Sequence, residues 1–271
     1  MVERFKRRDD IDGCACLECR NVSAATTKRR VGDVILWSVG FLRTHPSVVA
    51  VFLGLAVLQF VTHLAPTPVE LLLLPLLFVG SLFARGYAAM FAASTLSERP
   101  HTRKAVAWYT LRRVPAVFAI FVLVGLAMMA LFAVGGVLVF VVLIGSRLWH
   151  LLVGLLGFVV LFCLFVVISV KFILAAEAAV VGGYGPIESL RVSWSIVSFR
   201  RRTTILLIGL VVALVASFTI VGIGAATEPY PVLGNETVRH VFVGLMNAAT
   251  FLSTAITALV FAHVYVQGVL E

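Results

Sequence analysis

Three ionisable side chains interrupt otherwise apolar stretches of this chain: Arg85, Lys171 and Glu177. A charge inside a lipid-crossing segment is costly, and such residues pair with one another or mark a path for ions, protons or substrate. Arg85 and Glu177 carry opposite charges, so pairing them would reduce the cost of burying either one. The three residues therefore predict either charged anchors of a helix bundle or a polar pathway, and Arg85 is the first candidate for such a pathway.

The expected depth of these residues leaves both readings open. Counted from Glu70, Arg85 lies about 22 Å along a span that crosses a core roughly 30 Å thick. Its long stem could still carry the guanidinium to the interface. Counted from His150, Lys171 lies about 31 Å along its span and Glu177 lies beyond it, so both are expected at the cytoplasmic boundary.

Two short motifs add possible sites outside the membrane core. Cys14, Cys16 and Cys19 offer three thiolates for a soft metal, whereas a structural zinc site needs a fourth ligand. The alternative is a tail without a metal. Asn235 begins an N-x-T sequon in a predicted external loop, where glycosylation is possible. We expect no cofactor and no catalytic group.

The composition places the chain in a membrane. Apolar residues make up 61% and charged residues 13%, against roughly 25% charged residues in soluble domains. The uncharged intervals from Val114 to Ser146 and from Thr203 to Thr227 exceed the roughly 20 residues that cross a hydrocarbon core. Since these runs are apolar throughout and do not alternate, they favour helices over a barrel. The predicted fold class is an all-α polytopic membrane protein.

We expect six transmembrane helices in three hairpins. Pro66 with Pro68, Gly145 with Ser146, and the segment 228–234 mark the turns of the three hairpins. Residues 1–30 are too polar to fold alone and are predicted to be a disordered tail, and residues 31–271 form the membrane domain. The spans are expected at about 47–65, 70–95, 114–139, 150–176, 203–226 and 237–267.

Basic residues set the expected orientation. The tail to His45, the loop 96–113 and the loop 178–202 hold eighteen Lys and Arg residues, and the opposite side holds only Arg147 and Arg239. Basic residues resist translocation, so both termini should be cytoplasmic in a multi-pass protein of the cell membrane. The net charge of +9 is then explained by loops that face anionic lipid. Membrane lipids are therefore the expected partners, and nucleic acid is not.

Three stretches resemble amphipathic helices that lie in the interface: 31–45, 103–113 and 186–202. Each holds a tryptophan, namely Trp37, Trp108 or Trp194, and basic residues near its end. Either a threefold repeat of interfacial helix and hairpin or the general constraints of insertion would produce this pattern. In the third stretch one face holds Ile187, Leu190, Trp194 and Val197, while Arg191 lies elsewhere. That helix is a candidate contact for lipid headgroups or a protein partner.

The segments 171–177 (KFILAAE) and 185–194 (GPIESLRVSW) resemble a family of six-helix membrane proteins. The family includes the membrane domain of glycerophosphoryl diester phosphodiesterases and related uncharacterised bacterial and haloarchaeal proteins; 42–46 and the loop 96–113 are also similar to it. In that family a fused soluble domain carries the catalysis, and this chain has only a short tail outside the membrane. The resemblance therefore implies a shared scaffold, and a non-enzymatic scaffold or accessory protein is the leading hypothesis. A transporter or lipid-handling protein and a phospholipid-headgroup enzyme are the alternatives.

Overall fold

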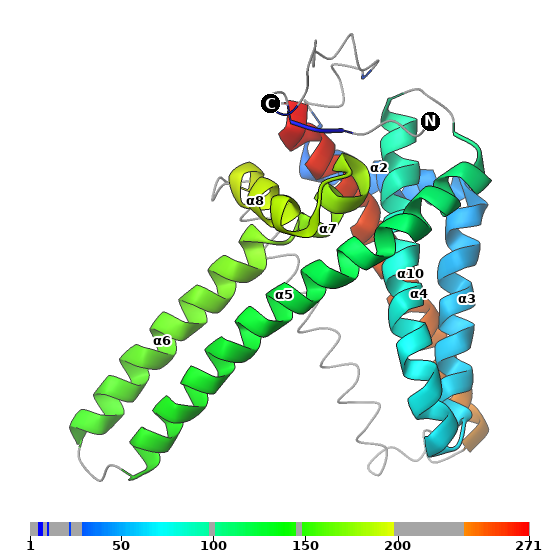
Figure 1. The fold of residues 1–271 in the computed structure, drawn as a ribbon. Helices are drawn as coiled ribbons and strands as arrows, with labels where there is room; N and C mark the ends of the chain where they lie inside the picture. The colour runs from blue at the N-terminus through cyan, green and yellow to red at the C-terminus, as the bar shows by residue number, and fades with distance from the viewer. Residues whose placement is uncertain are drawn as a thin grey trace.

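The computed structural model of the chain describes residues 5–7, 10, 22, 29–97, 101–144, 148–197 and 236–270. Within these ranges the secondary structure is helical and no strand is present (Figure 1). The elements are α2 (Val31–Thr44), α3 (Pro46–Leu64), α4 (Thr67–Leu96), α5 (Arg103–Ile144), α6 (Leu148–Lys171), α7 (Ala175–Glu177), the π-helix η2 (Ala178–Gly182), α8 (Pro186–Ile196) and α10 (Glu236–Leu270).

Five helical segments among the described residues are long and apolar enough to cross a membrane. They are Pro46–Leu64, Thr67–Leu96, Arg103–Phe140, Leu152–Gly182 and His240–Leu270. The helices α3, α4 and α10 match the ranges predicted from the sequence to within three residues. The predicted span at 203–226 lies outside the described residues.

One predicted boundary is absent. The basic stretch 103–113 was expected to be separate from the span that follows, but α5 is a single helix of 42 residues with Pro115 inside it. Pro115 lacks an N–H and removes one hydrogen bond, yet the helix continues past it. At 1.5 Å per residue α5 is about 63 Å long, roughly twice the thickness of a hydrocarbon core.

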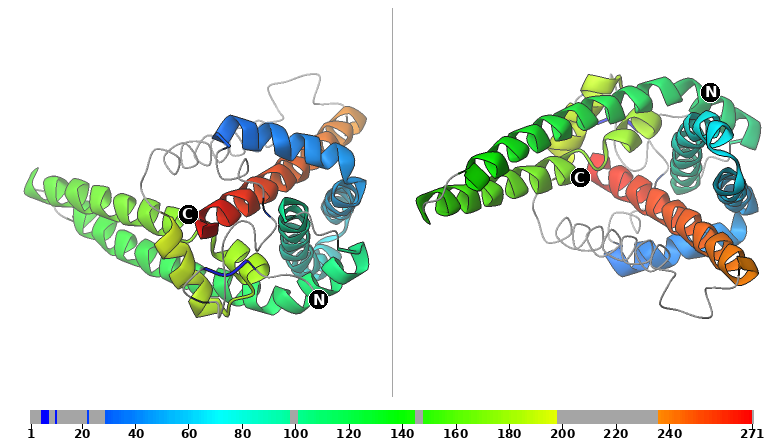
Figure 2. Two further views of the ribbon diagram at one scale, coloured as in Figure 1. Left: turned by 90° about the horizontal axis from the view of Figure 1, so that it is seen from above. Right: turned by 90° about the horizontal axis from the view of Figure 1, so that it is seen from below.

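The helices form two groups that meet at one end. Helix α10 packs against α3 and α4, and α4 packs against α5. The α5–α6 hairpin then runs away from α3, α4 and α10, as the three views of the ribbon agree (Figures 1 and 2). The short helices α2 and α8 lie at the end where α10 finishes. We call this end of the molecule, formed by α2, α8, the first turns of α5 and residues 255–270 of α10, the terminal end.

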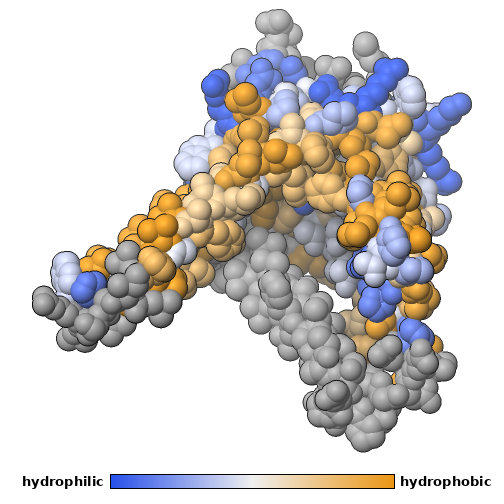
Figure 3. All heavy atoms as spheres, turned by 60° about the horizontal axis from the view of Figure 1, so that its bottom comes forward, coloured by the Kyte–Doolittle hydropathy of each residue, from blue (hydrophilic) through white to orange (hydrophobic). Residues whose placement is uncertain are grey.

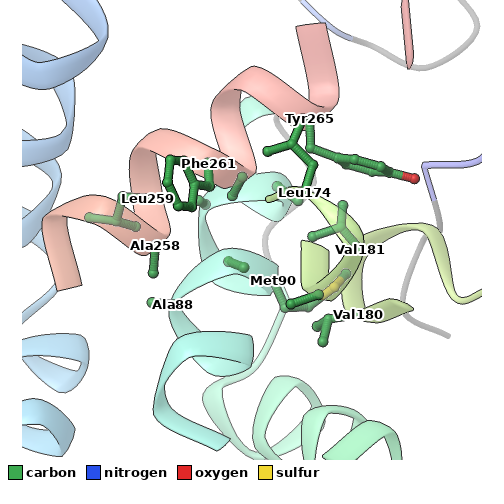
Figure 4. Close-up of a cluster of buried hydrophobic side chains, with 14 of the residues drawn as sticks. Ala88, Met90, Leu174, Val180, Val181, Ala258, Leu259, Phe261 and Tyr265 are labelled. Carbon is green, nitrogen blue, oxygen red and sulfur yellow. The ribbon is translucent and has the colours of Figure 1, made fainter. Parts of the chain in front are cut away.

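The buried core lies near the terminal end and is built largely from small residues. Alanines from three segments are buried there: Ala84, Ala88, Ala89, Ala92 and Ala93 of α4; Ala175, Ala178 and Ala179 of α7 and η2; and Ala255, Ala258 and Ala262 of α10. Small side chains let helix backbones approach closely. Larger residues such as Met90, Leu174 and Tyr265 fill the spaces between these helices (Figure 4).

Away from this core the helices expose apolar surface. Leu155, Leu156 and Phe158 of α6 are exposed, as are Leu71 and Leu72 of α4. The space-filling view shows hydrophobic residues along the α5–α6 hairpin and hydrophilic residues gathered at the terminal end (Figure 3). The described chain is therefore packed at one end and apolar on its outer surface along the helices.

Candidate functional site

A break in the helical chain lies at the centre of the terminal end. Helix α6 ends at Lys171, a turn follows at residues 172–174, and α7 and η2 continue to Gly182. Every residue of α7 and η2 is buried. Gly183 then takes a left-handed φ of 70°, which glycine adopts without the steric cost of a Cβ. Short π-helices are rare and occur often at functional sites. This broken segment is therefore the candidate functional site.

Arg85 and Glu177 form an ion pair inside this region. Arg85 of α4 donates from Nε at 3.1 Å and from Nη2 at 2.9 Å to Oε1 of Glu177 on α7. The Glu177 side chain is 1% exposed and that of Arg85 is 25% exposed. Phe261 of α10 lies under the guanidinium, with 5.4 Å from Cζ to the ring centre. The pair therefore joins α4, α7 and α10.

The sequence placed Glu177 at the cytoplasmic boundary but did not predict that its side chain is buried within the protein. The sequence count assumed that the fourth span continues straight to its end. Instead the chain turns after Lys171, and α7 packs against α4, α5 and α10. This turn carries Glu177 into the bundle, where Arg85 is the group that offsets its charge. The two residues that sequence analysis considered as a pair are thus in contact.

One oxygen of this carboxylate has no partner among the described residues. Both Arg85 bonds go to Oε1, and the buried Oε2 of Glu177 accepts none. Beside the pair is a cavity of about 10 Å³, lined otherwise by Leu82, Gly86, Ala89, Val117, Ala176 and Val180. This volume is about the minimum for one water molecule. The site therefore combines an unused acceptor with room for one small polar group, in an otherwise apolar lining.

Lys171 ties the end of α6 to the end of α8. Its Nζ donates to the carbonyl oxygens of Trp194 at 3.1 Å and Val197 at 2.6 Å. In return the Ser193 hydroxyl donates to the Lys171 carbonyl oxygen at 2.7 Å. Terminal helix carbonyls lack intrahelical donors and favour a nearby cation. Each helix end is thus capped by a residue of the other, and α8 is held in a fixed position.

Helix α8 turns two of its three serines inward and two of its large apolar side chains outward. Ser189, Val192 and Ser193 are buried, whereas Ile187 is 70% and Trp194 46% exposed. Arg191 is also exposed. The predicted apolar face is therefore divided, because Val197 is buried and Leu190 packs partly buried against the core.

Each of the three predicted interfacial tryptophans has a cation over its ring. The ring centre of Trp37 lies 5.7 Å from Arg29 Cζ, that of Trp108 lies 5.1 Å from Arg112 Cζ, and that of Trp194 lies 5.2 Å from Lys171 Nζ. The sequence separations of these pairs all differ, so the contacts share a chemistry without sharing a repeated motif.

Other predicted features are not brought into this site. Cys14, Cys16, Cys19 and Asn235 lie outside the described residues. Across the ranges that are described, no three His, Cys, Asp or Glu side chains come close enough together to hold a metal ion.

Sequence analysis missed two aromatic residues of the site. Phe261 stacks on Arg85, and the Tyr109 hydroxyl donates to the Val180 carbonyl oxygen of η2 at 3.1 Å. Aromatic residues are common in apolar helices and no spacing singles these two out. Only the packing of α5 and α10 against the broken segment identifies them.

Comparisons with protein-family models, curated proteins and solved structures find no match for this chain. The resemblance to the membrane domain of glycerophosphoryl diester phosphodiesterases therefore stays a prediction from short segments.

Proposed function

We propose that the chain is a six-span integral membrane protein that acts as a non-enzymatic scaffold or accessory protein. Its terminal end is cytoplasmic and contacts anionic lipid headgroups. The orientation of α8 is the observation that carries this proposal, because a helix with buried serines and an exposed isoleucine and tryptophan suits a membrane interface better than water.

The path of the chain supports an even number of spans. Helix α8 lies at the terminal end, and α10 starts at the opposite end and finishes at the terminal end (Figure 1). The proposal therefore assigns one crossing to the interval between Val197 and Glu236. That interval contains the uncharged run from Thr203 to Thr227, which is long enough to cross. Added to the five described helices, this crossing makes six.

The terminal end combines cations with exposed apolar groups. Besides Ile187 and Trp194 of α8, Leu36 of α2 and Trp108 of α5 are exposed. Tryptophan is favoured at headgroup depth, and each Lys or Arg near an anionic surface adds roughly 1 kcal/mol of attraction. Helices α2, α5 and α8 therefore all present exposed apolar side chains at the terminal end.

The topology is tested by labelling single cysteines with a membrane-impermeant maleimide. In a background with the four native cysteines replaced by serine, His63→Cys should react from outside intact cells. Lys104→Cys should react only after the membrane is opened. The opposite pattern would place the termini outside and overturn the proposal.

The lipid contact is tested by quenching of tryptophan fluorescence. A variant that keeps only Trp194 should be quenched more by brominated phosphatidylglycerol than by brominated phosphatidylcholine in vesicles. A variant that keeps only Trp149, which is exposed in the first turn of α6, is the matched control and should show no such preference. Equal quenching of Trp194 by both lipids would remove the role of anionic headgroups.

A second candidate is a transporter or lipid-handling protein with Arg85 on an anion path. The broken helix favours it, since transporters place such helices at their binding sites. Proteoliposomes should then scramble fluorescent phosphatidylglycerol, and Arg85→Ala should abolish this while Arg85→Lys retains part of it. An Arg85→Ala protein that folds and scrambles at the full rate would exclude Arg85 from the path.

A further inference from the structure

The first described residues of the chain lie between η2, α8 and α10, where sequence analysis expected a disordered tail. Phe5 is 1% exposed and belongs to the core. Its N–H donates to the Val181 carbonyl oxygen at 3.0 Å, and its carbonyl oxygen accepts from the Tyr265 hydroxyl at 2.8 Å. At this residue the tail is thus held by its side chain and by both of its backbone polar groups.

Tyr184 organises the residues that follow Phe5. Its hydroxyl accepts from the Arg7 N–H at 2.8 Å and donates to Oδ2 of Asp10 at 2.6 Å. The Lys6 ammonium lies 5.4 Å from the centre of the Tyr184 ring, and Arg7 Nη1 donates to Ser195 Oγ of α8 at 3.1 Å. These contacts therefore involve an aromatic residue, two cations and an acid, in that order along the segment.

The receiving surface suits a segment of this charge. Carbonyl groups at a helix end lack intrahelical donors and carry partial negative charge. Phe5 supplies a donor to the end of η2, and Lys6 and Arg7 bring positive charge beside it. A segment with acidic residues at these two positions would lose the cation over the Tyr184 ring and the donor to Ser195 Oγ. The complementarity is therefore one of both shape and charge.

We propose that the surface formed by Val181, Tyr184, Ser195 and Tyr265 is a binding site for an extended peptide with an aromatic residue followed by two basic residues. The chain's own Phe5–Arg7 segment is its resident ligand, and it exchanges with a free peptide of the same chemistry. Exchange is expected because one aromatic side chain and a few hydrogen bonds oppose the entropy of ordering the segment. When bound, the segment covers the end of the broken helix that carries Glu177.

Docking is tested by trypsin cleavage of the full chain in detergent. Cuts after Lys6 and Arg7, identified by mass spectrometry, should be slow in the native protein. Phe5→Ala should speed them on the order of tenfold, because cleavage follows the undocked population. Phe132→Ala, the same substitution at an exposed phenylalanine of α5, is the matched control and should leave the rate unchanged. Equal rates in all three proteins would overturn the docking.

Exchange is tested with a synthetic peptide of residues 2–12 added in trans. It should speed cleavage of the native tail, whereas the same peptide with Phe5→Ala should not. In the Tyr265→Phe protein, which keeps the ring but loses the hydroxyl donor, the native peptide should compete less well. If both peptides compete equally or neither does, the surface is not a specific peptide site. These outcomes do not depend on lipid contact at α8, so they are independent of the proposed function.

Discussion

Arg85 directs both of its hydrogen bonds to a single oxygen of Glu177, which lies 92 residues later in the chain. A side-by-side guanidinium and carboxylate would use both oxygens. Here the second oxygen is buried and has no partner within the described residues. The contact therefore holds α4 to the broken segment, and it leaves Oε2 of Glu177 as an unused hydrogen-bond acceptor inside the bundle.

The energetics of this pair can be measured by a double-mutant cycle. Arg85→Leu leaves a charge buried at Glu177 and should cost about 3–5 kcal/mol. The double variant Arg85→Leu/Glu177→Leu should recover most of that loss, because apolar residues often replace a buried ion pair without penalty. Unfolding in mixed micelles of SDS and a mild detergent, followed by circular dichroism, gives the free energies. Additive losses would show that the two charges do not interact.

Two serines one turn apart on α8 should respond in opposite directions. Both are fully buried, but Ser193 donates to Lys171 while Ser189 Oγ has no partner among the described residues. Ser193→Ala should destabilise the fold by about 1 kcal/mol, and Ser189→Ala should stabilise it by a similar amount because an unsatisfied hydroxyl is removed. The same unfolding assay measures both. Two losses of equal size would contradict an unsatisfied hydroxyl at Ser189.

The helices pack so closely at Gly86 that adding a single methyl group there should destabilise the fold. A Cβ there would lie 2.9 Å from Thr110 Cγ2 and 3.3 Å from Val180 Cγ2. Gly86→Ala should therefore destabilise the fold by about 1–3 kcal/mol through overpacking. Gly125→Ala on α5, where a Cβ would meet nothing within 4 Å, should be neutral or stabilise by up to about 1 kcal/mol. Thermal aggregation of the purified variants ranks them, and equal midpoints would contradict this packing.

The docked tail should weaken at high pH. Burial, and then the hydrogen bond to Asp10, raise the pKa of Tyr184 above its usual value. An unfolded tyrosine titrates near pH 10, so the stability linked to Tyr184 is fully present below about pH 10 and is lost as pH rises through the folded pKa. The difference in tyrosinate absorbance between the native protein and Tyr184→Phe gives that pKa. A difference signal that titrates near pH 10 would contradict the burial.

Local signals predicted much of the helical layout. Pro46 marks the start of α3, and the turn at Pro66 separates α3 from α4, because proline fixes φ and is favoured in a first helical turn. The basic stretch 103–113 misled the sequence analysis, since a change in polarity was taken as a break in the backbone. In α5 the backbone hydrogen bonds continue across that change, and charge alone does not end a helix.

The long-range contacts were beyond sequence reasoning. Nothing in the charged tail distinguishes Phe5 as a core residue, because its partners Val181 and Tyr265 are distant and no periodic pattern links them. The inward placement of Ser189 and Ser193 likewise reverses the usual reading of an amphipathic helix. That reading assumes that water covers the outer face, whereas the proposed surroundings of α8 are lipid.

The bond between Phe5 and Tyr265 joins residues 260 positions apart, which sets an order of events during synthesis. A chain emerges from the ribosome N-terminus first, so Phe5 is exposed while every later helix is made and inserted. Its receiving surface is complete only when the last turns of α10 have left the ribosome. A chain stopped before Tyr265 would keep residues 5–7 accessible to proteases, and docking of this segment would mark a chain whose α10 has been made as far as Tyr265.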